Sequence, residues 1–412
     1  MNRKRFLFIL PFFPWPLVSG GHQGLFNSIK AVRDYADIHL VYYAGQRDTA
    51  RRYHETLKQQ LGGTVRIHPY VDRPGKWTKD VAFRKIGNKI FKRADPFSYL
   101  LFTKLHDSAY YRFVDALIRT HRIDLVQADM AETLDFMLTL PPGVKRVFVH
   151  HELRYVRNAQ LLERAGEDPY RRALFEEEKI KEIALLNRCD QVVTVSAADR
   201  DKLLAAGVTA PVHASFSIVN SPVLPAGAAG AAGPGGRRLA YVGPEAHYPN
   251  KLGLQWFLDT VWPLIKARDA AFRMDIIGQW SRATAAEWSR RYPDVRFSGF
   301  VEDLASALRG STMVVPIFVG SGIRMKLLET MAFGVPFVST PVGAEGIPVQ
   351  DGVQGFIADD AETFAECVFR AEDPSVRERM AAEGQRLVRT YYSEEALARD
   401  KRAMYEKLLG AL

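Results

Sequence analysis

Cysteine is scarce in this chain, and the cysteines that are present are far apart. Among 412 residues only Cys189 and Cys367 occur, and neither belongs to a C-x-x-C motif or a cluster of cysteine and histidine. Disulfide-stapled folds and structural zinc sites usually group several such residues at short spacing. We therefore expect neither in this protein, and cysteine usage is typical of a protein of the reducing cytoplasm.

Long apolar runs are also missing. The longest, Phe6–Val18, has 13 residues and is interrupted by three prolines, whereas a membrane-spanning helix needs about 20 apolar residues. The basic residues before this run and the small residues after it could also indicate a secretory signal. We favour a buried first strand that enters a glycine turn.

The composition lies close to the average of globular proteins. The chain is 47% hydrophobic and 25% charged, which excludes a disordered, collagen-like or fibrous protein. Its length fits two domains of about 200 residues each.

Positive charge is concentrated in one block of the chain. Of a net charge of +9, residues 51–100 contribute twelve Lys and Arg against four Asp and Glu. Phe83, Ile86 and Ile90 recur there at helical spacing between basic residues, and aromatic residues flank them. Such a segment, at 77–102, suits an anionic membrane surface; an ordinary surface helix is the alternative. Nucleic acid is not expected as a partner, because no recognised binding motif accompanies the charge.

Short β-rich runs alternate with amphipathic helical patterns along the chain, which predicts parallel sheets covered by helices on both faces. A Gly/Ala-rich stretch interrupts this pattern once, and the pattern then restarts. We predict two doubly wound domains, at 1–218 and 238–390, joined by a linker at 219–237. The predicted strands are Phe6–Leu10, Ile38–Tyr43, Val65–Tyr70, Leu125–Ala128, Val147–His150, Gln191–Ser196 and Val212–Ser215, then Leu239–Val242, Arg273–Ile277, Val295–Ser298, Met313–Pro316 and Phe337–Thr340.

The most informative stretch covers residues 316–336. A predicted strand ends at Pro316, small residues form a turn, and a helix is expected to begin at Gly322. The backbone N–H groups and dipole of such a helix start favour an anion. Arg324 and Lys326 add two cations in the first turn, and Glu329 follows at a spacing suited to sugar hydroxyls. We expect a phosphate site.

This stretch reads G-S-G-x-R-x-K-x-L-E and resembles the nucleotide-sugar signature of glycosyltransferase family 4, usually E-G-F-G-x-x-x-x-E. Glu329 matches the second glutamate, which the resemblance casts as a ligand of the donor ribose. Ser321 replaces the first glutamate, a departure that concerns the contact to the donor sugar ring. Further similar segments lie at 241–251, 295–303 and 340–346, and the end of the chain, 391–412, resembles a terminal helix that crosses back to the first domain.

The resemblance implies a GT-B fold: two Rossmann-like domains facing across a cleft, the first binding the acceptor and the second the nucleotide sugar. It implies charge neutralisation of the leaving diphosphate by Arg324 and Lys326. The residues that it implies for donor binding are Gly20, Gly21, Gly243, Lys251, Gly299, Phe300, Val301, Ser321, Gly322, Ile323 and Glu329.

Two adjacent histidines follow the predicted strand at 147–150. A histidine at the carboxyl end of a strand can serve in proton transfer or hydrogen bonding, although such a pair is also often structural. The family places a histidine at the end of an equivalent strand. The match falls on His150 or His151, with His151 slightly preferred because His150 can still belong to the strand.

The resemblance thus predicts a retaining transferase that moves a hexose-type sugar from a nucleotide-diphosphate sugar to a glycan or lipid-linked acceptor, in cell-surface polysaccharide or glycolipid assembly. It would act in the cytoplasm, with peripheral contact to the inner face of the membrane. We expect no cofactor besides the donor and no catalytic metal, because the one D-x-D pair noted, Asp199 and Asp201, lies in a helical pattern. A sugar-nucleotide epimerase of similar fold and a non-catalytic nucleotide-sugar-binding protein are the alternatives.

Overall fold

The computed structural model describes residues 3–410 apart from 18, 46, 63–64, 72–107, 167, 217–222 and 224–236. The segment 77–102 and nearly all of the linker 219–237 lie outside the described residues. The chain divides into two compact units: unit 1 comprises Met1–Ser217 and Leu397–Leu412, and unit 2 comprises Ile218–Ala396.

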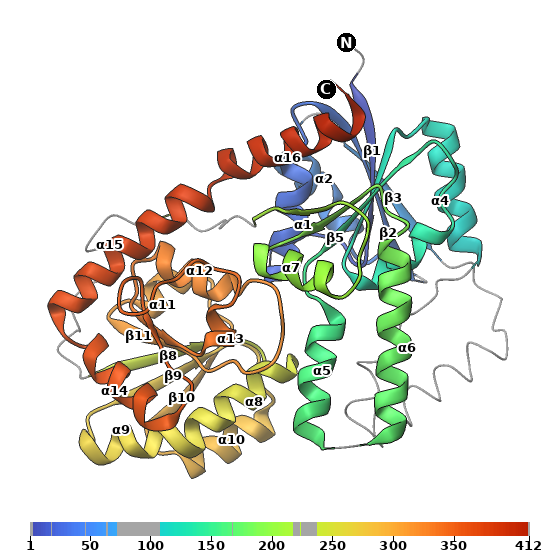
Figure 1. The fold of residues 1–412 in the computed structure, drawn as a ribbon. Helices are drawn as coiled ribbons and strands as arrows, with labels where there is room; N and C mark the ends of the chain where they lie inside the picture. The colour runs from blue at the N-terminus through green and yellow to red at the C-terminus, as the bar shows by residue number, and fades with distance from the viewer. Residues whose placement is uncertain are drawn as a thin grey trace. The chain divides into compact units, whose positions relative to one another are not determined.

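Within the described residues, unit 1 is built on a seven-stranded parallel sheet with the order β3-β2-β1-β4-β5-β6-β7. Figure 1 labels β1, β2, β3 and β5 of this sheet. Its strands are β1 Lys4–Leu10, β2 Ala36–Gly45, β3 Val65–Val71, β4 Leu125–Asp129, β5 Lys145–His150, β6 Gln191–Thr194 and β7 Val212–Ala214. Phe6 and Phe8 of β1 pack into one apolar cluster, and the alternate residues Leu7 and Ile9 pack into another. Because successive side chains point to opposite faces of a strand, the central strand is buried on both sides.

Helices cover both faces of this sheet. They are α1 Gly20–Lys30, α2 His54–Leu61 (after the short turn η1 Arg51–Tyr53), α4 Ser108–His121, η3 Ala131–Leu138, α5 Arg154–Ala165, α6 Pro169–Leu186, α7 Ala197–Ala205 and α16 Glu394–Leu409. Helix α1 begins at Gly20, because the Ser19 side chain accepts a hydrogen bond from the His22 backbone N–H and caps the helix. Tyr405 of α16 packs edge-on against Phe6, with 5.0 Å between ring centroids.

Unit 2 is built on a six-stranded parallel sheet with the order β10-β9-β8-β11-β12-β13 over its described residues. Its strands are β8 Arg238–Val242, β9 Arg273–Ile277, β10 Val295–Gly299, β11 Ser311–Val315, β12 Phe337–Ser339 and β13 Phe356–Ile357. Its helices are α8 Tyr248–Trp256, η4 Phe257–Val261, α9 Trp262–Arg268, α10 Arg282–Arg291, α11 Leu304–Leu308, α12 Met325–Ala332, α13 Pro341–Ala344, α14 Ala361–Ala371 and α15 Pro374–Tyr391. Strand β13 has only two residues, so no alternation of apolar and polar residues in the sequence could predict it.

Both sheets are doubly wound, as the alternation of strand and helix patterns predicted. In each, the strand order reverses beside a central strand, β1 in unit 1 and β8 in unit 2. In open α/β sheets, ligands bind beyond the carboxyl ends of the strands at such a reversal. No helix among the described residues is both long and apolar enough to span a bilayer.

Candidate functional site

The carboxyl edge of the sheet in unit 2 is lined by glycines. Gly243, Gly278 and Gly299 end or follow β8, β9 and β10, and the Gly278 N–H donates to the Gly299 carbonyl oxygen at 2.8 Å. A Cβ on Gly278 would lie 2.6 Å from the Gly243 carbonyl oxygen, and one on Gly243 would lie 2.6 Å from the Asn250 amide nitrogen. Only glycine fits these positions, so backbone forms this edge and a ligand can approach it closely.

The loop between β11 and α12 follows the predicted turn, but the helix begins later than predicted. Gly320 and Gly322 have positive φ values of 126° and 76°, and α12 starts at Met325 rather than at Gly322. Arg324 occupies the N-cap position, and its Nη1 donates to the carbonyl oxygens of Ser321 (2.5 Å) and Gly322 (3.1 Å). The guanidinium therefore folds back over the turn instead of extending along the helix.

Lys326, in the first turn of α12, is largely buried and carries the clearest electrostatic signal. Its ammonium donates to the Asn250 side-chain oxygen at 2.9 Å and lies 4.8 Å from the centre of the Tyr241 ring. Burial, and then the neighbouring Arg324, lower its pKa to about 7. Among the described residues no carboxylate lies within ion-pair distance of it. A desolvated cation that lies beside a second cation and has no carboxylate partner among these residues, next to a helix N-terminus, favours an anionic ligand.

Lys251, which we also predicted for donor binding, is held by an acidic partner. Its Nζ lies 2.9 Å from a carboxylate oxygen of Glu245. Partial burial opposes ionisation of Glu245, but hydrogen bonds from Lys251, Thr284 and Ser281 outweigh it and lower the pKa of Glu245 to about 2. The structure therefore brings Asn250, rather than Lys251, to Lys326. Sequence reasoning missed Asn250, although it directly precedes the lysine in the segment that we had singled out.

The other predicted donor residues of unit 2 lie on the same sheet edge or beside it. Gly299 ends β10 with a φ of 69°. Phe300 follows it with 62% of its surface exposed, and Val301 is partly buried. Ser321 is buried, Ile323 is partly buried, and Glu329 is partly buried one turn after Lys326. Gly278 was missed, although it directly follows a predicted strand.

In unit 1, the structure separates the two adjacent histidines. His150 is the last residue of β5 and is buried, and its Nε2 lies 2.6 Å from a carboxylate oxygen of the buried Glu182 on α6. His151 has left the strand, and its Nε2 lies 3.0 Å from Asp129 Oδ1. Asp129 is buried at the carboxyl end of β4. His150 thus serves packing, and His151 is the candidate for chemistry.

Asp129 belongs to a buried polar network that reaches α16. Its Oδ2 accepts from the Gln127 side-chain amide at 2.7 Å, and Gln127 also donates to Ser28 at 2.9 Å. The Tyr405 hydroxyl donates to the Gln127 side-chain oxygen, and Lys401 Nζ donates to Ser28 at 3.4 Å. The C-terminal helix thereby helps to fix the residue that orients His151. Asp129 could have been suspected, because it directly follows a predicted strand.

Helix α1 passes close to His151. A Cβ on Gly24 would lie 3.0 Å from both Nδ1 and Cε1 of the His151 ring. Gly20 and Gly21, the predicted double glycine, begin the same helix, and a Cβ on Gly21 would lie 3.2 Å from the Met130 methyl carbon. Glycine at position 24 therefore lets α1 pack this close to the imidazole, a role that sequence reasoning missed.

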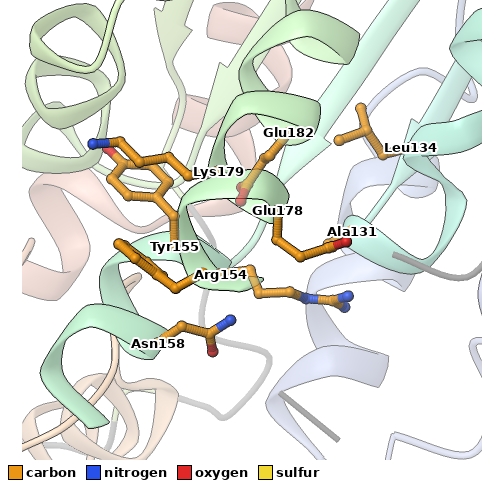
Figure 2. Close-up of a pocket in the computed structure, with 9 residues that line it drawn as sticks. Ala131, Leu134, Arg154, Tyr155, Asn158, Glu178, Lys179 and Glu182 are labelled. Atoms are coloured by element: carbon orange, nitrogen blue, oxygen red, sulfur yellow. The ribbon is translucent and has the colours of Figure 1, made fainter. Parts of the chain in front are cut away.

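Glu182, the partner of His150, lines a small pocket (Figure 2). It is lined by Ala131, Leu134, Arg154, Tyr155, Asn158, Phe175, Glu178, Lys179 and Glu182, which come from η3, α5 and α6. Its volume of about 10 Å³ holds roughly one water molecule. It is too small for a sugar, so His151 remains the candidate for chemistry in unit 1.

Comparison with known proteins identifies the fold. The structure of Anabaena HepE in complex with UDP aligns over 98% of this chain and 99% of that chain, with a TM-score of 0.65 and 14% identity. Sucrose-phosphate synthase from Thermosynechococcus elongatus aligns over 98% and 99%, with a TM-score of 0.72 and 15% identity. The fold is GT-B. This confirms the predicted fold class.

Sequence comparison covers part of the chain. Residues 236–372 match the protein-family model described as "Glycosyl transferases group 1". This stretch contains the glycine edge and Lys326. A Klebsiella pneumoniae protein, "Uncharacterized 44.6 kDa protein in cps region", is 28% identical over 126 residues. The match covers 28% of this chain and 32% of that protein, about a third of the length of the curated relative.

Proposed function

We propose that this protein is a family 4 glycosyltransferase that moves a hexose-type sugar from a nucleotide-diphosphate sugar to a glycan or lipid-linked acceptor. The observation that carries the proposal is Lys326, a largely buried ammonium at the start of α12 that donates a hydrogen bond to a neutral amide oxygen. The match at 236–372 supports it. So do the GT-B structures of similar fold, among them HepE with UDP and with UDP-glucose.

In this proposal unit 2 binds the donor. Lys326 and Arg324 would face the diphosphate, together with backbone N–H groups of Ser321, Gly322 and Ile323. Glu329 would accept hydrogen bonds from the ribose hydroxyls, and the backbone at 299–301 would contact the base. Ser321, which stands where the common motif has glutamate, would offer a hydroxyl to the donor sugar.

The transfer itself needs charge stabilisation more than a strong base. The acceptor oxygen would bond to the anomeric carbon with retention of configuration. The bond from that carbon to the diphosphate oxygen would break with its electron pair, and the acceptor proton would pass to the departing diphosphate. Lys326 and Arg324 would stabilise the charge that develops there, the task that a metal ion performs in other transferases. We therefore propose a metal-independent reaction without a further cofactor.

The His151–Asp129 pair would act on the acceptor side, in unit 1. A carboxylate that accepts from Nε2 holds the proton on that nitrogen and leaves a lone pair on Nδ1. The absence of a side chain at Gly24 avoids a close contact with this Nδ1 edge. His151 would thus accept a hydrogen bond from a substrate hydroxyl and orient it, with Asp129 as a positioning residue.

We place the reaction in the cytoplasm, at the inner face of the membrane, in the assembly of surface polysaccharide or glycolipid. The basic segment 77–102 motivates this part, because a polybasic amphipathic segment is attracted by anionic lipids. An anionic or lipid-linked acceptor would be drawn to the same charge.

Thermal unfolding with UDP, GDP, dTDP and ADP, and with their sugar conjugates, tests the proposal. A ligand that binds the folded state raises the unfolding midpoint, so we expect a clear rise with one base. Lys326→Ala should weaken that nucleotide's affinity at least about tenfold, since it loses a charge-assisted phosphate contact. Arg290→Ala, which removes an exposed cation of unit 2, should leave the affinity unchanged.

Two outcomes would count against the proposal, one against the assigned site and the other against donor binding. Unchanged affinity in Lys326→Ala would refute the site but leave the activity open. No midpoint shift with any nucleotide would refute donor binding itself.

A further inference from the structure

Three histidines that are far apart in the sequence meet in unit 1. His39 lies on β2, His68 on β3, and His121 is the last residue of α4. One ring nitrogen of each lies within 4.8 Å of the others. His39 Nδ1 and His68 Nε2 are 3.1 Å apart. The sequence predicted no structural zinc site, because it showed no short-range cluster of ligands.

The cluster lies apart from the residues assigned to transfer. Helix α4 runs back from the carboxyl ends of the strands and leads into β4, which begins at Leu125. Its last residue, His121, therefore lies toward the amino edge of the sheet. His151 and Asp129 lie at the carboxyl edge, so the His cluster has no part in the proposed reaction.

The three imidazoles are suitable ligands for a metal ion. His39 is buried, His68 and His121 are partly buried, and a neutral imidazole presents one ring nitrogen with a lone pair. His121 ends a helix, where the macrodipole favours a nearby positive charge.

The positive charges of Arg66 and Arg5 oppose the binding of a metal ion, and the surroundings of each residue weaken this effect. Arg66 Nη1 lies 3.5 Å from His39 Nε2, the ring nitrogen that faces away from His68. The Arg66 side chain is exposed, so water screens it. The charge of Arg5 also acts on His39. Arg5 is paired with Asp124, at 3.7 Å between Nε and a carboxylate oxygen.

We propose that His39, His68 and His121 bind one divalent transition-metal ion, of which Zn²⁺ is the best candidate. Imidazole is a preferred zinc ligand at about 2.0–2.1 Å, which places the nitrogens of a tetrahedral site roughly 3.3 Å apart. The His39–His68 pair already lies near this spacing at 3.1 Å, and the His121 ring nitrogen lies within 4.8 Å of both. Water would take the fourth position.

The ion would have a structural role. It would tie α4 to β2 and β3 and close the long chain segment between His68 and His121. Cross-links that close long segments remove much conformational entropy from the unfolded chain. Binding to the folded state would then raise stability with the logarithm of the zinc concentration once that concentration exceeds the Kd.

Zinc titration of the metal-free full chain tests this proposal. We expect one Zn²⁺ per chain by calorimetry, a rise in the unfolding midpoint that EDTA reverses, and visible absorption typical of tetrahedral coordination when Co²⁺ is used instead. His68→Gln and His121→Gln should each weaken zinc binding at least about tenfold. His54→Gln, which removes an imidazole of the same unit outside the cluster, should bind zinc as the parent does.

A further variant keeps the test informative if a histidine variant folds poorly. Arg66→Gln removes the cation beside His39 and should tighten zinc binding severalfold. A parent chain that binds no zinc would overturn the proposal. So would equal zinc binding in the parent, His121→Gln and Arg66→Gln, because the ion would then sit elsewhere.

Discussion

At the scale of single residues, two lysines of the predicted donor site differ in the charged and polar groups that surround them. Lys251 and Lys326 are both lysines of the predicted donor site. Lys251 is neutralised by Glu245 at 2.9 Å, whereas Lys326 contacts an amide and has its pKa lowered to about 7. When both lysines are protonated, only Lys326 lacks a carboxylate partner among the described residues. We therefore assign the main diphosphate contact to Lys326.

The lowered pKa of Lys326 predicts how nucleotide affinity depends on pH. A bound diphosphate favours the charged ammonium and raises its pKa, so binding takes up a proton wherever the free protein has lost it. The affinity for the nucleotide diphosphate should fall as pH rises from 7 to 9, by at most about tenfold per unit. Titration calorimetry at several pH values measures this slope.

Lys326→Arg is the matched control for this slope. Arginine stays protonated throughout this range, so its affinity should change little with pH. A parent protein whose affinity is equally flat from pH 7 to 9 would show that Lys326 does not gain a proton on binding.

At the scale of elements, α16 completes unit 1. Leu397, Met404 and Tyr405 bury its apolar side, while Lys401 and the Tyr405 hydroxyl enter the polar network of Ser28, Gln127 and Asp129. This helix thus contributes both packing and the hydrogen bonds that hold the partner of His151. We infer that its loss would disturb the carboxyl edge of the sheet as well as overall stability.

Tyr405→Phe isolates the polar part of this contribution. The variant keeps the ring but leaves the buried Gln127 side-chain oxygen without its donor, which typically costs about 1–3 kcal/mol. Urea unfolding followed by circular dichroism should show that loss. Tyr170→Phe, at a position 71% exposed on α6, should change stability by less than about 0.5 kcal/mol. Equal stability of the two variants would show that the hydroxyl bond contributes nothing.

At the scale of the whole molecule, charge is distributed very unevenly. Most of the net charge of +9 arises from residues 51–100. Attraction of such a block to an anionic surface acts over roughly 10 Å in dilute salt and weakens as salt is added. The proposed membrane contact therefore has a characteristic dependence on lipid charge and ionic strength.

Sedimentation with lipid vesicles measures this contact. The protein should sediment with anionic vesicles at low salt, remain in solution with neutral ones, and be released at high salt. A triple variant, Lys85→Gln, Lys89→Gln and Arg93→Gln, should reduce sedimentation. The control triple Arg282→Gln, Arg290→Gln and Arg379→Gln removes the same charge from exposed positions of unit 2 and should not. If both triples lose binding equally, net charge rather than this segment is responsible.

Local signals in the sequence determined much of the fold. Alternation of short apolar runs with helical periodicity predicted both doubly wound sheets, because a strand that is buried on two faces must be apolar throughout. Turn glycines and the G-S-G-x-R-x-K-x-L-E stretch located the carboxyl edge of unit 2. These features depend on residues only a few positions apart.

Other features were decided by tertiary structure alone. Asn250 with Lys326, Asp129 with His151, and the cluster of His39, His68 and His121 each join residues from different elements. The start of α12 and the partners of His150 and His151 also depend on what packs around them. Parallel strands bring residues that are distant in the chain to one level of a sheet, and the register that does so is set by packing of the whole domain. The sequence by itself therefore determined which residue types were available at each edge, and folding decided which of them meet.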